Sequence, residues 1–168
     1  MIRIINLFFI IFFLLSAKAY SLIEIDITRG NLDPLPIAVS PLFQDDNSKR
    51  NSINELKIEN VGSEISLVVE NNLKISGLFN PLSKEAFLQK PDIAHLKPRF
   101  EDWALIKAQA LITGKVTIED KKLKVEFRLW DILAGREMMA LAFTTVPSNW
   151  RRVGHIISDK VYERLTGE

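Results

Sequence analysis

The sequence predicts one α/β domain, of the α+β type, with two long amphipathic helices on one face of a mixed sheet of about five strands. Residues 123–130 alternate Leu, Val and Phe with Lys, Glu and Arg, and residues 111–119 alternate in the same way, which is the period of half-buried strands. Residues 58–73 and 150–165 instead place apolar residues three and four positions apart, as in helices with one buried side. A sheet and helices that are each apolar on one side are expected to cover one another.

Residues 108–144 are expected to form a three-stranded antiparallel meander. Residues 120–122 are the first hairpin loop, residues 132–135 make the second turn, and residues 136–144 are the third apolar run. The pattern changes to helix at Ser148, so the last helix is expected to pack back on the meander.

The preceding part of the chain supplies two more strands. Residues 36–42 are a short apolar run bounded by prolines, and residues 78–82 are a brief extended segment. The helix at 58–73, which Gly77 is expected to close, connects these strands, so they should be parallel with a right-handed crossover. After one turn of helix near residue 84 and a loop at 89–98, a short helix follows, in which Trp103 is expected to be a core residue.

The first 19 residues have the layout of a secretory signal peptide. Arg3 is followed by a run of twelve residues at 4–15, apolar except for Asn6, and by Ala17-Lys18-Ala19, with cleavage expected after Ala19. Twelve residues are far fewer than the roughly 20 that a spanning helix needs, so no membrane span is expected after cleavage. We therefore expect residues 20–168 to form the folded domain, in the periplasm or outside the cell.

Residues 22–28 have two open interpretations. Three isoleucines alternate with two carboxylates, so a strand here would have one apolar and one acidic face. It is either the first core strand or an edge strand or arm that adds to the sheet of a protein partner. The candidate partner-binding residues are Leu22, Ile23, Glu24, Ile25, Asp26 and Ile27.

Signatures of catalysis are missing from the sequence. It has no nucleophile elbow, no phosphate-binding glycine loop and no cysteine, and its two histidines, His95 and His155, are far apart. Asp45 and Asp46 lack the other ligands of a calcium loop. A formal net charge of +1 gives no reason to expect a nucleic-acid partner. The sequence predicts no enzyme, metal or cofactor.

Three stretches resemble the amino-terminal domain of TolB, the periplasmic component of the Tol-Pal cell-envelope system. They are residues 36–41, residues 72–82 with a Ser-Gly-x-Phe-x-Pro-Leu turn, and residues 150–167 with the terminal Tyr-Glu-Arg-Leu-Thr-Gly. The resemblance extends over the signal peptide and essentially all of residues 20–168. It implies a fold similar to tRNA-synthetase anticodon-binding domains, and a non-catalytic interaction protein that maintains outer-membrane integrity and contributes to constriction at division.

The resemblance also implies a binding segment. In that family the mature N-terminal segment docks on the domain or is freed to bind TolA, and by position this segment is residues 22–27. TolB continues into a six-bladed propeller that binds Pal and needs roughly 250 further residues, which this sequence does not contain, so Pal binding is not carried over. We expect a truncated or split reading frame or a separately encoded propeller. The alternative is a remnant structural domain without an independent partner.

Overall fold

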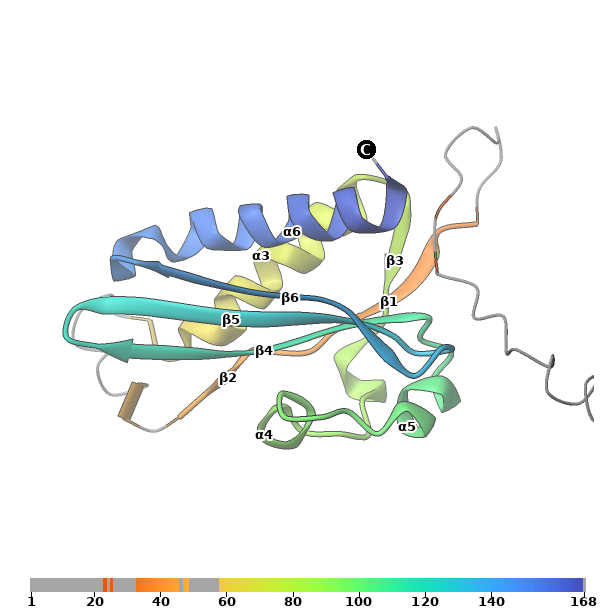
Figure 1. The fold of residues 1–168 in the computed structure, drawn as a ribbon, viewed down its shortest axis with the longest axis horizontal. Helices are drawn as coiled ribbons and strands as arrows, with labels where there is room; N and C mark the ends of the chain where they lie inside the picture. The colour runs from red at the N-terminus through yellow and green to blue at the C-terminus, as the bar shows by residue number, and fades with distance from the viewer. Residues whose placement is uncertain (1–22, 24, 26–32, 46, 49–57, 168) are drawn as a thin grey trace, which may run out of the picture.

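In a computed structural model, the described residues are 23, 25, 33–45, 47–48 and 58–167, and they form a mixed six-stranded sheet between two layers of helices (Figure 1). The strands are β1 (Leu35–Val39), β2 (Phe43–Gln44), β3 (Phe79–Pro81), β4 (Ala110–Glu119), β5 (Lys122–Asp131) and β6 (Arg136–Thr145). The helices are α3 (Val61–Ile75), α4 (Pro91–Ala94), α5 (Phe100–Leu105) and α6 (Trp150–Thr166), with 3₁₀ turns η1 (Lys84–Ala86) and η2 (Pro147–Asn149). The predicted class, a mixed sheet with two long helices on one face, is confirmed.

The sheet has the order β3-β1-β4-β5-β6, and β2 pairs with the far part of β4. β1 is parallel to both β3 and β4, which confirms the predicted parallel pair joined by α3. β4, β5 and β6 are antiparallel neighbours, as the meander prediction requires. The first hairpin loop is one residue shorter than predicted, because Lys122 already begins β5 and only Asp120 and Lys121 turn the chain.

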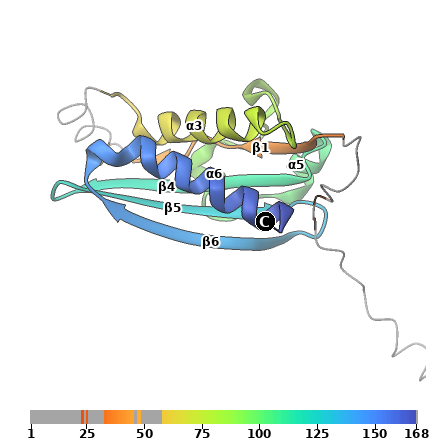
Figure 2. The same ribbon diagram turned by 90° about the horizontal axis from the view of Figure 1, so that it is seen from above.

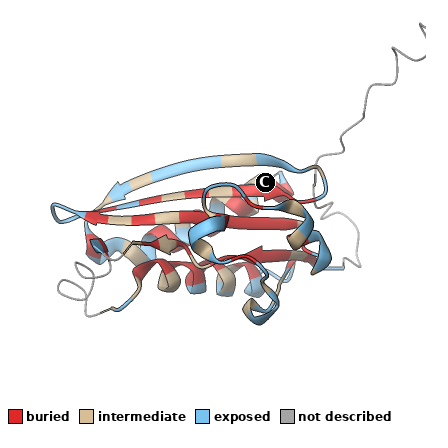
Figure 3. Cartoon of the chain, turned by 90° about the horizontal axis from the view of Figure 1, so that it is seen from below, coloured by how far each residue is buried: buried red, intermediate tan, exposed pale blue. Residues whose placement is uncertain are grey.

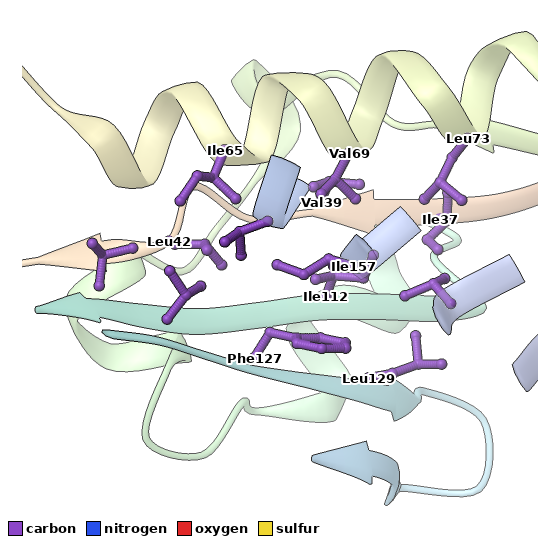
Figure 4. Close-up of a cluster of buried hydrophobic side chains, with 14 of the residues drawn as sticks. Ile37, Val39, Leu42, Ile65, Val69, Leu73, Ile112, Phe127, Leu129 and Ile157 are labelled. Atoms are coloured by element: carbon purple, nitrogen blue, oxygen red, sulfur yellow. The ribbon is translucent and has the colours of Figure 1, made fainter. Parts of the chain in front are cut away.

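The main core lies between the sheet and the two long helices. Ile65, Val69 and Leu73 project from α3 toward the sheet, where Figure 4 shows them above Ile37 and Val39. Fully burying each such side chain stabilises the fold by roughly 1.5–3 kcal/mol. Figure 2 shows α3 and α6 next to each other above the sheet, with β6 extending beyond α6.

A second, smaller core lies on the opposite face of the sheet, under α4 and α5 (Figures 1 and 3). The sequence assigned no face of the sheet to the short helix, and it predicted a loop at residues 89–98, where α4 instead lies. The buried members of this core are Ala38, Ala94, Trp103, Ala108, Leu111, Trp130 and Ile132. Trp103 is a core residue as predicted, and its indole N–H donates to Gln89 Oε1 at 2.7 Å.

Capping explains where α3 begins and ends. The side chain of Asn60 accepts a hydrogen bond from the Ser63 N–H at 2.9 Å, so the helix begins at Val61, three residues after the predicted start. It ends at Ile75, and Gly77 then adopts a φ of 75°, which is the left-handed conformation expected of a glycine after a helix. Within the described residues, no helix combines the length and apolarity needed to cross a membrane.

Candidate interaction site

The predicted binding segment is represented in the structure by two of its six residues. Ile23 and Ile25 are half-buried and pack against the main core, and the backbone N–H of Ile25 donates to the Leu165 carbonyl at 2.7 Å. Neither residue belongs to a strand, so the core-strand interpretation finds no support in them. Leu22, Glu24, Asp26 and Ile27 lie outside the described residues.

The end of α6 offers this acceptor for a simple reason. The last four carbonyls of a helix have no partner within it and must be satisfied in other ways. Here the Gly167 N–H donates to the Glu163 carbonyl at 3.0 Å. The Leu165 carbonyl instead accepts the hydrogen bond from the Ile25 N–H. The sequence held no signal for this contact, which joins residues more than a hundred positions apart.

The docked contact is energetically small. One backbone hydrogen bond contributes about 1 kcal/mol net, and half-burying two isoleucines adds about 2 kcal/mol. Fixing the backbone of two residues costs roughly 2–4 kcal/mol in conformational entropy. Since these two amounts nearly cancel, the contact at Ile23 and Ile25 is of a strength that a competing partner can displace.

A cleft of about 500 Å³ lies between β2, the start of α3 and α4. It is lined by Pro41, Leu42, Phe43, Gln44, Asn60, Ser63, Lys90, Pro91 and Asp92. Beside it the ring of His95 stacks on Phe43, with 4.5 Å between ring centroids, and His95 Nδ1 lies 3.0 Å from the Pro91 carbonyl. His95 is therefore a half-buried packing residue, although it falls in the stretch predicted as a loop.

Polar groups around this cleft serve the fold. Gln44 Oε1 accepts the Gly62 N–H at 3.1 Å, and Asn60 caps α3. The carboxylate of Asp45 accepts the Ser48 N–H at 2.7 Å, and this hydrogen bond holds the pKa of Asp45 below its ordinary value of 3.8. These groups bind neighbouring backbone, and Ser63, Lys90 and Asp92 complete the polar lining of the cleft.

The two histidines lie on opposite sides of the sheet. His155 is on α6, where its Nδ1 lies 2.8 Å from Asn72 Nδ2 of α3, whereas His95 belongs to the layer of α4. In the part of the chain that the structure describes, no three His, Cys, Asp or Glu residues are grouped so as to hold a metal ion.

The fold and this contact define a class: a small α/β domain in which Ile25, ahead of the first strand, bonds the end of the last helix. The sequence family model of the TolB amino-terminal domain matches residues 23–138 of this chain. The chain belongs to the TolB amino-terminal domain family.

Comparison with known proteins agrees with this membership. The chain is 75% identical over 160 residues to the Tol-Pal system protein TolB of Pelagibacter ubique (strain HTCC1062), a match that covers 95% of this chain and 36% of that protein. The crystal structure of TolB from Acinetobacter baumannii has a TM-score of 0.62 at 21% identity, over 80% of this chain and 29% of the other. The hypothetical protein CT253 from Chlamydia trachomatis has a TM-score of 0.54 at 13% identity, over 78% of this chain and 98% of the other. The two structures show a shared fold.

Proposed function

We propose that this chain is a periplasmic protein-interaction domain of the Tol-Pal cell-envelope system, and that it binds TolA through Leu22, Ile23, Glu24, Ile25, Asp26 and Ile27. In this role it maintains outer-membrane integrity and contributes to envelope constriction at division. The identity of 75% to a Tol-Pal system protein supports the assignment of this chain to that system. The match spans about a third of that protein, so binding to Pal is not part of the proposal.

The hydrogen bond from Ile25 to Leu165 is the observation that carries the proposal. It engages the arm through its backbone at a helix end, and Ile23 and Ile25 are half-buried there. A segment held in this way can exchange its contacts for those of another protein. Once freed, its alternating isoleucines and carboxylates suit it to join a partner's sheet as an added strand.

The test measures, by isothermal titration calorimetry, the binding of residues 20–168 to the C-terminal domain of TolA. Deletion of residues 20–28 should abolish binding, and Ile25→Asp should weaken it by at least about tenfold, because a charge would replace an apolar contact in the added strand. Ile75→Asp is the matched control, since Ile75 is 83% exposed at the end of α3 and should tolerate the same change.

Equal affinity after the deletion would reject residues 22–27 as the site. If TolA binds none of these proteins while all of them melt cooperatively, the TolA assignment is wrong, and a structural domain without this partner becomes the better description.

A further inference from the structure

Among the described residues, no strand pairs with the outer edge of β6, and only Arg164 reaches its backbone, with Nε 3.4 Å from the Met138 carbonyl. β6 is the last strand of the sheet, ten residues long, and most of it is exposed (Figure 3). Edge strands usually carry lysine, proline or inward-pointing charges that prevent pairing with another chain. The charges of β6 are confined to Arg136 and Glu137 at its start, and residues 138–145 contain no charge and no proline. A bulge opposite Leu129 and Trp130 interrupts only this first part.

The side of β6 that faces the helix layer is apolar. Met139, Leu141 and Phe143 are paired with Leu129, Phe127 and Val125 of β5, and directly paired residues share a face of the sheet. The three β5 residues are buried in the main core, whereas Leu141 is 38% exposed. Figure 2 shows why: α6 covers the neighbouring strands, and β6 projects past it.

We propose that this edge binds the β6 edge of a second copy of the chain, antiparallel, about a two-fold axis at Leu141. In that register Leu141 meets Leu141 of the second copy, and Met139 meets its Phe143, so apolar groups lie opposite one another on the helix side. On the other side of the sheet, Ala140 meets Ala142, and neither obstructs a close approach of the strands. The two sheets become one continuous sheet.

Charge placement selects this occupant and this direction. Since the charges are at one end of β6, the antiparallel pair sets Arg136 and Glu137 against the uncharged end of the second strand, near Thr144 and Thr145. A parallel pair would instead put each arginine and glutamate beside its own copy, where like charges directly opposite are destabilising. The pattern of residues 139–143 reads as apolar, small, apolar, small, apolar in both directions, so one strand complements itself.

The first experiment measures the mass of the exported chain by sedimentation equilibrium. An edge-only interface is small, so we expect dimers at about 100 µM and monomers at about 1 µM. Leu141→Lys should shift dimerisation to at least tenfold higher concentration, because two lysines would meet at the axis. Leu133→Lys is the matched control, since Leu133 is 72% exposed in the turn before β6 and should leave the dimer intact. Far-UV circular dichroism melts check that both variants fold.

The second experiment tests the register. The chain has no cysteine, so single-cysteine variants report one position each. Leu141→Cys should form a disulfide-linked dimer under mild oxidation, because residue 141 lies opposite itself, whereas Leu133→Cys and Thr145→Cys should link far more slowly. A wild-type chain that stays monomeric at about 100 µM, or a Leu141→Lys chain that dimerises as well as the wild type, would overturn the proposal. Faster linkage at residue 145 than at 141 would overturn the register.

Discussion

Replacing Gly154 with alanine should destabilise the protein, although alanine favours helices more than glycine does. Gly154 lies on α6 where the helix crosses α3, and it is buried. A Cβ atom at this position would lie 2.8 Å from Val68 Cγ1, 2.9 Å from Val68 Cβ and 3.4 Å from the Ile65 carbonyl oxygen. Carbon atoms pack best at about 3.5–4.0 Å, so the new methyl group is too close by roughly 0.7–1 Å.

Two opposing effects set the size of the change. Alanine improves the helical propensity of α6 by about 1 kcal/mol relative to glycine. Overpacking a tight core contact costs about 1–3 kcal/mol, and the upper part of that range applies here because Val68 Cβ is fixed to the α3 backbone and cannot rotate away. The packing cost is the larger effect, so we expect a net loss of about 1–2 kcal/mol in the free energy of unfolding.

Urea unfolding of wild type, Gly154→Ala, Val68→Ala and the double variant measures this directly. Val68→Ala alone should also be destabilising, because it removes two buried methyl groups. The double variant should lose less stability than the sum of the two single losses, since removing Val68 Cγ1 relieves the contact at 2.8 Å, while the contact with Cβ at 2.9 Å remains. If Gly154→Ala raises the stability by the full propensity gain of about 1 kcal/mol, the helices are not in close contact at this point and the reasoning is refuted.

Three further predictions concern single sites. Gln89→Leu should lower the free energy of unfolding by about 1–3 kcal/mol, because it leaves the buried Trp103 indole N–H and the Arg99 backbone N–H without their acceptor; an undiminished loss in a Trp103→Phe background would show that the indole hydrogen bond does not contribute. Lys121→Gly should stabilise the protein by roughly 0.5–1 kcal/mol, because Lys121 has a φ of 59°, in the left-handed region that is unfavourable for residues with a Cβ atom. A lower melting temperature would contradict this. The lowered pKa of Asp45 means that its carboxylate stabilises the fold above pH 3.8, and this stabilisation is lost as the pH falls further. In a series of thermal melts, Asp45→Asn should therefore melt at a lower temperature than the wild type at pH 7, and the melting temperature of the variant should fall less on acidification below pH 3.8. A pH profile identical to that of the wild type would exclude Asp45 as a contributor.

Elements with a strong period were predictable. The meander alternates with period two, and both long helices have apolar stripes with period 3.6, so tertiary packing and local pattern agree there. The small core under α4 and α5 was not predictable in the same way. Leu111 and Trp130 lie on the face that alternation assigns to solvent, and α4 is four residues long, too short to show a period. Their burial depends on a long-range contact that no local pattern encodes.

The candidate binding segment, residues 22–27, remains a prediction. Alternation selected it, because a terminal strand with one apolar face needs a surface to cover that face. It did not identify Leu165 as the docking point, since the contact joins residues near the two ends of the chain. The sequence predicted β6 only as the third strand of the meander, because it does not show which strand of a sheet lies at the edge.

β4 belongs to both cores at once. Ala110 and Ile112 enter the main core, while Leu111 between them enters the smaller one. A slip of one residue along β5 would therefore exchange the two sets of side chains and spoil both interiors together. The position of β4 therefore fixes both helical layers, and neither layer can shift along the sheet unless the other shifts with it.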